Sequence, residues 1–189
     1  MTRISDVTIR RATPADYQRI LRLQEANLIT NLTAAETEDG FLSKKFSEIQ
    51  FKEMNMDLGV VVADYNGEIV GYLCGASFKY GQQFQILQVI IGMFGQLRIN
   101  GKELTPDKTF IYGPVCIARD FRGAGLLSRL FAALKEIAEH AYKFCILFIA
   151  DTNTRSLKAH IEKLGMTELG MFTVHEKSYH LLGAALSAD

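Results

Sequence analysis

The sequence predicts an α/β fold for this chain of 189 residues. A buried apolar run, Phe110 to Ile117, leads through a glycine-containing loop into an amphipathic helix. Asn-Gly pairs at 66–67 and 100–101 separate β-prone runs, and such two-residue turns join antiparallel strands. Two further β-rich runs, 166–172 and 176–182, close the chain. The strands are therefore expected to be joined partly by hairpins and partly through helices.

The composition is that of a folded protein without excess charge. Hydrophobic residues make up 48%, and 21 basic residues balance 21 acidic ones. A nucleic-acid-binding domain would show a basic excess, so nucleic acid is not an expected partner. The start of the chain has no signal-peptide apolar segment, and no apolar run approaches the roughly 20 residues of a membrane span. Cys74, Cys116 and Cys145 lie in apolar runs and are expected to be reduced, buried thiols. The sequence therefore predicts a cytoplasmic protein without a membrane partner.

The first half of the chain alternates strand and helix signals. Residues 7–11 form a short strand, and Thr13-Pro14-Ala15-Asp16 starts a helix with Thr at the N-cap and an acid at N3. The polar stretch 29–40 is expected to be a loop, with a short helical turn at most. A second helix is predicted over 41–56. Its expected core contacts are Phe41, Phe46, Ile49 and Met56.

Two hairpins with an apolar segment between them follow. Residues 60–65 and 68–77 flank Asn66-Gly67 and predict the first hairpin, because both central positions need a positive φ. The segment 84–94 has apolar residues at helical spacing, which predicts a helix. Residues 97–104 form a small hairpin around Asn100-Gly101.

The loop between the central strand and its helix predicts an anion site. Gly123 and Gly125 stand where the helix begins, and without Cβ atoms they let the backbone bend and approach a ligand closely. The unpaired N–H groups of the first turn and the macrodipole favour a phosphate or pyrophosphate there. Arg122 adds a cation beside them. The alternative is an ordinary strand-to-helix turn that contains two glycines.

Two common phosphate-binding patterns do not fit this loop. A P-loop needs Lys-Ser/Thr after its last glycine, and Leu126-Leu127 follow here. A dinucleotide-binding fingerprint needs glycine or alanine at position 128, which is serine, and a first strand near the start of a βαβ unit.

The next strand and helix bring a second group of polar residues. A buried strand over 144–150 precedes a helix that begins near Ser156 and ends at Gly165, a glycine C-cap. Asn153, Ser156 and His160 are spaced so that they share one face of this region.

These two blocks together resemble the GCN5-related N-acetyltransferase superfamily, also called GNAT. Its cofactor motif, Q/R-x-x-G-x-G/A between a strand and a helix, corresponds to residues 120–125, with Asp120 at the first position. Its second segment, N-x-x-A/S followed by Y/H and then G-F/M, corresponds to Asn153, Ser156, His160 and Gly165-Met166, with one extra residue before Gly165.

The resemblance implies the fold and the cofactor. It implies an α/β (α+β) GNAT-like acyl-CoA N-acyltransferase fold: a mixed, mostly antiparallel twisted sheet of about seven strands flanked by helices. It implies one domain over 1–189, with 82–106 inserted between the third and fourth strands as a lid, a subunit contact or a helix that covers the core. Acetyl-CoA would be the cofactor. Its pyrophosphate would be held by amides of Arg122, Gly123, Ala124, Gly125, Leu126 and Leu127, and its pantetheine by the main chain of Val115, Cys116 and Ile117. Asn153 would bind the pantetheine, and Ser156 would lie near the phosphates or the arm.

The resemblance also implies acetyl transfer to a primary amine that attacks the thioester directly. His160 takes the position of a tyrosine near the sulfur and would protonate the leaving thiolate, or would only shape the pocket. The run 110–117 has no carboxylate, so the base stays open among Glu36, Glu38, Tyr112, Tyr179 and a water relay. No metal is implied. The partner would be a small-molecule or peptide amine, and a homodimer stays open.

Two alternatives remain at this stage. One is a non-catalytic acyl-CoA-binding or regulatory module of the same fold, which the missing strand carboxylate keeps open. The other is an unrelated nucleotide-binding α/β domain, which would prefer ATP or NAD to CoA.

Overall fold

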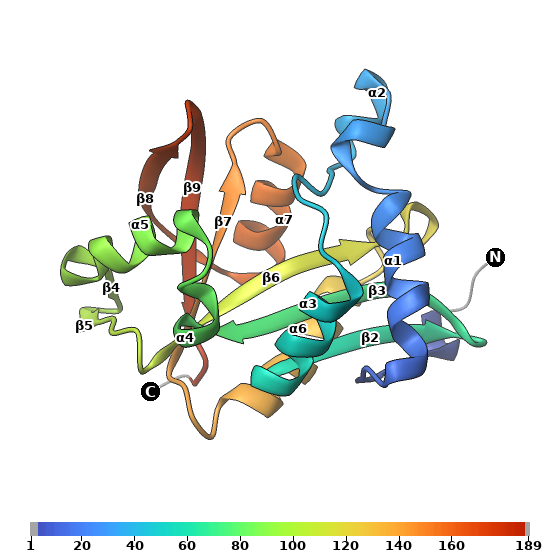
Figure 1. Ribbon diagram of the computed structural model, residues 1–189, viewed down its shortest axis with the longest axis horizontal. Helices are drawn as coiled ribbons and strands as arrows, with labels where there is room; N and C mark the ends of the chain where they lie inside the picture. Colours follow the sequence, from blue (N-terminus) through green and yellow to red (C-terminus); the bar gives the residue numbers. More distant parts are fainter. Residues whose placement is uncertain (1–3, 188–189) are drawn as a thin grey trace.

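A computed structural model describes residues 4–187 of the chain. Its main sheet has seven strands in the order β1-β2-β3-β6-β7-β9-β8, flanked by helices (Figure 1), which confirms the predicted fold class. The strands are β1 (Val7–Arg11), β2 (Gly59–Tyr65), β3 (Glu68–Ser77), β4 (Arg98–Ile99), β5 (Lys102–Glu103), β6 (Thr109–Ile117), β7 (Phe144–Ala150), β8 (Thr167–Val174) and β9 (Lys177–Ala185). The α-helices are α1 (Tyr17–Glu25), α2 (Ala34–Thr37), α3 (Glu48–Asp57), α4 (Phe78–Gly81), α5 (Gln85–Met93), α6 (Leu126–Ala138) and α7 (Thr154–Leu164). None of the helices within residues 4–187 is long and apolar enough to cross a membrane.

Strands β6 and β7 form the parallel pair of the sheet, and they separate along their length. Their register covers Thr109↔Phe144, Phe110↔Cys145 and Ile111↔Ile146, so the second half of each strand leaves the other. β6 stays paired with β3 to its end, and β7 stays paired with β9. The register between β3 and β6 shifts opposite Gly113 and Pro114. The sheet is therefore open in its middle, at the carboxyl ends of β6 and β7.

The period-two alternation of β2 places the core on both faces of the sheet. Val61 and Ala63 pack in one buried cluster with residues of α6. Val60 and Val62 face the opposite side, where they pack with residues of α1 and α3. Because both faces are covered, β2 is apolar throughout most of its length rather than alternately polar.

Both Asn-Gly hairpins are confirmed. Asn66 and Gly67 have φ of 52° and 86°, and Asn100 and Gly101 have φ of 51° and 74°. These positive values are the ones a type I′ turn requires at its two central positions. The first turn joins β2 to β3, and the second joins β4 to β5.

The predicted helix over 41–56 is wrong in its first half. Helix α3 begins after Ser47, whose hydroxyl accepts the N–H of Gln50 while the Gln50 side chain accepts the Ser47 N–H. This capping box fixes the helix start, and residues 41–46 run ahead of it as irregular chain. The buried face then consists of Phe51, Met54 and Asn55. Two expected core residues, Ile49 and Met56, are instead 68% and 76% exposed.

The segment between β3 and β6 covers part of the core. The predicted helix is confirmed as α5, and Leu87, Ile90 and Phe94 pack in one buried cluster with residues of β7 and β9. The side chains of Gln85 and His175 lie 2.8 Å apart (Oε1 to Nε2), so the start of α5 is joined to the turn between β8 and β9. The segment is therefore a packed part of the fold, and residues 83–87 near its start line the opening beside β6 and β7.

The three cysteines are buried and free, as expected. Burial raises the pKa of both Cys116 and Cys145 to about 12. Thiols with such pKa values stay protonated at neutral pH, which fits packing rather than nucleophilic roles.

Candidate functional site

Two cavities meet where β6 and β7 separate. One, of about 550 Å³, lies against the loop from Phe121 to Gly125 and the start of α6, and is called here the glycine-loop cavity. The other, of about 650 Å³, lies between the β6–β7 opening and residues 41–46 and 83–87, and is called the aromatic cavity. Six residues line both: Phe41, Leu42, Val115, Asn153, Ser156 and His160.

The glycine loop has the backbone geometry that the sequence predicts. Gly123 and Gly125 have φ of 76° and 81°, a left-handed conformation that favours glycine. No atom lies within 4 Å of the place where a Cβ would stand at either residue, so the backbone borders open space. Gly125 is the N-cap of α6 and offers no side chain to the orphan N–H groups of the first turn. The loop can therefore present amides and helix dipole to an anion.

Arg122 lines the glycine-loop cavity, and its guanidinium hydrogen-bonds to three other groups of the protein. Its guanidinium donates to the carbonyls of Ile117 (2.9 Å) and Asp39 (2.7 Å) and to the Asn27 side-chain oxygen (2.6 Å). Its own N–H donates to the Arg119 carbonyl at 3.1 Å. Burial lowers the pKa of Arg122. Arg122 thus ties residues 27–40 to the glycine loop. Beyond it, Gly123, Gly125, Leu126 and Leu127 line the cavity, and Ala124 does not.

Asn153 and Ser156 build the other side of the same opening. The Asn153 side-chain oxygen accepts the Ser156 N–H and caps α7, and its amide nitrogen donates to the Phe41 carbonyl at 3.0 Å. The segment around Phe41 is therefore held over the opening by Arg122 on one side and Asn153 on the other. This tether had no signal in the sequence, because its partners are 112 residues apart.

His160 forms a buried pair with Tyr112, which reaches it from β6. Nδ1 lies 2.7 Å from the Ser156 carbonyl oxygen, which can only accept, so we assign the proton to Nδ1. Nε2 then accepts the Tyr112 hydroxyl at 3.2 Å. Both side chains are 2% exposed. Burial lowers the pKa of His160 and raises that of Tyr112, so both are neutral near pH 7. The imidazole therefore has no proton directed at either cavity.

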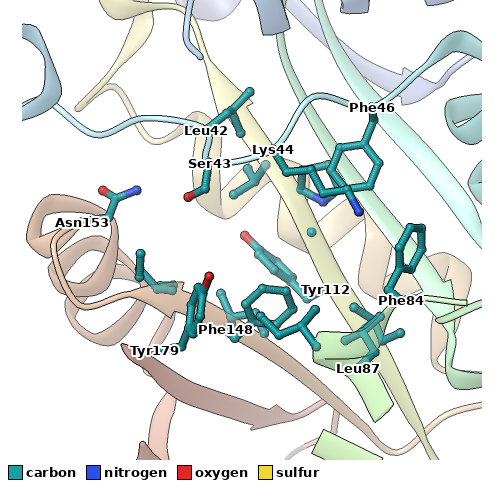
Figure 2. Close-up of a pocket in the computed structure, with 18 of the residues that line it drawn as sticks. Leu42, Ser43, Lys44, Phe46, Phe84, Leu87, Tyr112, Phe148, Asn153 and Tyr179 are labelled. Atoms are coloured by element: carbon teal, nitrogen blue, oxygen red, sulfur yellow. The ribbon is translucent and has the colours of Figure 1, made fainter. Parts of the chain in front are cut away.

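The aromatic cavity has rings on both sides. Figure 2 shows Tyr112 between Phe148 and Tyr179 on one side and Phe84 on the other. Lys44 extends beside Phe46, with its ammonium 5.3 Å from the Phe46 ring centroid and 4.1 Å from that of Phe84. Partial burial lowers the pKa of Lys44. No sequence pattern selects Lys44, Phe84 or Phe148, since each becomes part of a site only when distant segments meet.

The four base candidates separate into two groups. Tyr112 and Tyr179 line the aromatic cavity. Glu36 instead accepts the N–H and hydroxyl of Thr33 and lies 3.6 Å from Arg119. Bonds from Thr33 and the charge of Arg119 lower the pKa of Glu36. Neither Glu36 nor Glu38 lines either cavity.

Basic side chains surround the outer part of the glycine-loop cavity. Arg155 lies 3.5 Å from Asp39, and Lys158 lies 3.8 Å from Glu162. Lys163 also lines the cavity, and within residues 4–187 no carboxylate lies within ion-pair distance of its ammonium. The cavity thus combines backbone amides with cations, the donors that recognise phosphates.

The chain belongs to the acetyltransferase (GNAT) family. The family model described as Acetyltransferase (GNAT) family matches residues 26–166, well over half of the chain. The match includes β6, the glycine loop, α6, β7 and α7. The fold and the two motifs therefore identify a member of a family of acetyltransferases.

Solved structures with the same fold cover nearly the whole chain. One is yncA of Salmonella typhimurium, solved with its cofactor acetyl-CoA: TM-score 0.64, 17% identity, covering 97% of this chain and 96% of that one. A Staphylococcus aureus Mu50 N-acetyltransferase has TM-score 0.63, 19% identity and coverage of 96% and 99%. The Escherichia coli ribosomal-protein-S18-alanine N-acetyltransferase has TM-score 0.61, 12% identity and coverage of 97% and 96%.

A curated protein matches over a shorter stretch. Over 91 residues, 48% of this chain, the sequence is 29% identical to Elongation factor 4 of Lactococcus lactis subsp. cremoris (strain SK11). The aligned stretch covers 15% of that protein.

Proposed function

We propose that this chain is a single N-acetyltransferase domain that transfers the acetyl group of acetyl-CoA to a primary amine by direct attack in a ternary complex. The observation that carries the proposal is the junction of the two cavities. One cavity offers amides and cations, the other offers an aromatic chamber, and both reach Val115 and His160. Two substrates bound side by side would bring their reacting groups together there.

The residues present fit acetyl-CoA. Gly123 and Gly125 leave room for close approach of a pyrophosphate, and the first-turn amides of α6, up to Leu127, supply donors. Beyond Ile111, β6 has no β7 partner, so its edge around Val115 can pair with an extended pantetheine as an added strand would. Bound acetyl-CoA supplies the activated thioester.

The Tyr112–His160 pair is the proton acceptor that we propose for the attacking amine. Burial raises the pKa of Tyr112, so its hydroxyl can take a proton only while it passes its own to Nε2 of His160, 3.2 Å away. Nδ1–H stays on the Ser156 carbonyl and stabilises the imidazolium that results. His160 would therefore act through Tyr112, the residue that touches substrate, instead of protonating the thiolate itself.

The experiment is acetyl-CoA turnover measured by thiol release over a panel of amines, together with acetyl-CoA binding by calorimetry. The variant is Gly123→Glu, which adds a carboxylate where the phosphates would lie. The matched control is Gly67→Glu, because Gly67 has a similar φ of 86° and equally open surroundings.

We expect wild type and Gly67→Glu to bind acetyl-CoA and release thiol, and Gly123→Glu to lose both. Binding without turnover on any amine would favour the non-catalytic acyl-CoA-binding module of the same fold. Equal binding by Gly123→Glu would contradict the proposed cofactor site.

A further inference from the structure

The charges that line the aromatic cavity all have one sign. Lys44 and Lys177 are the lysines of this lining, and its two histidines are His175 and the buried His160. None of the lining residues, all within 4–187, is an aspartate or glutamate. A cavity built for a polycationic amine would need carboxylates, because like charges repel strongly in a partly desolvated site.

Lys44 is held at the wall by rings and not by an acid. Its ammonium contacts Phe84 and Phe46, and no carboxylate among the described residues lies within 4 Å of it. The next residue, Lys45, behaves differently: its ammonium is 2.6 Å from Glu25. An ammonium without a counterion in the lining of an apolar cavity is a natural partner for a carboxylate on a ligand.

The rest of the cavity selects for an apolar body. Phe148 and Tyr179 have ring centroids 5.7 Å apart, and Phe46 and Phe84 have theirs 6.4 Å apart. The cavity volume of about 650 Å³ is within the range of small-molecule sites. Its rings offer faces against which an aromatic or branched aliphatic group can pack.

From these three observations we infer that the acceptor is an amine with an aromatic or large apolar body and a carboxylate, with Lys44 as the group that binds the carboxylate. The inference rests on the proposed function, since it names the substrate class of that site. It also fits the chemistry of attack: nearby lysines lower the pKa of a bound substrate ammonium and favour the neutral amine that reacts. The same charges disfavour polyamines.

The test compares amines that differ only in the carboxylate. L-Phenylalanine is paired with phenethylamine, and 4-(aminomethyl)benzoate with benzylamine, with spermidine as the cationic probe. We expect at least one acid to exceed its neutral partner by about tenfold or more in kcat/KM, the effect of one well-placed charge pair. Spermidine should be the poorest acceptor.

A lysine variant localises the effect. In Lys44→Met the advantage of the acid over its neutral partner should fall to about twofold or less, since the charge pair is removed while the apolar stem is kept. The KM for acetyl-CoA should not change, because Lys44 does not line the glycine-loop cavity. Lys45→Met is the matched control and should keep the wild-type preference. Calorimetry with N-acetyl-L-phenylalanine and N-acetyl-4-(aminomethyl)benzoate, without cofactor, gives a readout independent of turnover, and Lys44→Met should weaken the binding of the preferred product.

The outcomes separate the two claims. Turnover that is equal or better with neutral amines or spermidine overturns the substrate class and leaves the proposed function intact. An acid preference that survives in Lys44→Met overturns the role of Lys44. Failure to bind acetyl-CoA and to release thiol with every amine overturns the proposed function itself.

Discussion

Tyr112 is the residue on which the proposed chemistry depends most directly. It lies on β6, lines the aromatic cavity and donates to His160. Tyr112→Phe keeps the ring and removes the proton relay. We expect kcat to fall by about a hundredfold or more, as for loss of a general base, with the KM for acetyl-CoA within a few-fold of wild type. Steady-state kinetics on the best amine measures both.

The control is Tyr179→Phe, because Tyr179 lines the same cavity and was the other tyrosine candidate for the base. It should retain most of kcat. An unchanged kcat in Tyr112→Phe, or an equal loss in Tyr179→Phe, would count against the relay.

His160 should make the stability of the protein depend on pH. Burial lowers its pKa below the ordinary 6.5, while the bond from Nδ1 to the Ser156 carbonyl opposes the shift. Below about pH 6.5 the unfolded chain therefore takes up a proton that the folded chain still refuses, and stability falls as pH drops toward the folded pKa. Above pH 6.5 both forms are neutral and the contribution is constant.

Urea unfolding at pH 7.5 and 5.5 tests this. The difference in free energy of unfolding between the two pH values should be smaller in His160→Gln, because this variant lacks the imidazole whose pKa burial lowers. An identical difference in His160→Gln would mean that His160 does not titrate as inferred.

At the scale of the element, the start of α3 is set by its cap. Ser47 and Gln50 exchange two bonds, so Ser47→Ala leaves an N–H of the first turn without its acceptor. We expect a loss of about 1 kcal/mol in the free energy of unfolding, measured by urea denaturation. If the helix ran from Phe41 instead, the same change would place the best helix former in a helix interior and would be neutral or stabilising.

The same cap explains why residues 41–46 are available to the site. They lie outside the helix, so Phe41 and Leu42 can pass over the opening between the strands while Lys44 and Phe46 line the aromatic cavity. In a helix over 41–46, the side chains would instead be distributed around the helix axis at the helical period. The position of one serine therefore decides both an element boundary and a wall of the site.

At the scale of the whole molecule, the sequence predicts features that neighbouring residues determine. It does not predict contacts between residues that are far apart in the chain. The hairpin at Asn66-Gly67 and the loop at Gly123 and Gly125 need a positive φ, which few residues other than asparagine and glycine adopt readily. A short stretch of sequence is therefore enough to predict these turns. The Tyr112–His160 pair joins residues 48 apart and depends on where β6 leaves β7. No periodic pattern in the sequence shows that these two residues meet. For this reason the family resemblance indicated His160, while Tyr112 was only one of several candidates for the general base.

A ligand that spans the opening should raise the free energy of unfolding, because it would bind both halves of the sheet. One half contains β6, and the other contains β7, on which α7 packs. Acetyl-CoA at a hundredfold over its dissociation constant adds about 2.7 kcal/mol to the free energy of unfolding. For a chain of this size the midpoint of thermal unfolding should rise by roughly 5–10 °C. NAD and ATP at the same concentration should produce smaller shifts, since neither carries a pantetheine to pair with the edge of β6. Thermal unfolding followed by circular dichroism measures this. A larger shift with NAD or ATP than with acetyl-CoA would contradict the proposed binding of acetyl-CoA across the opening.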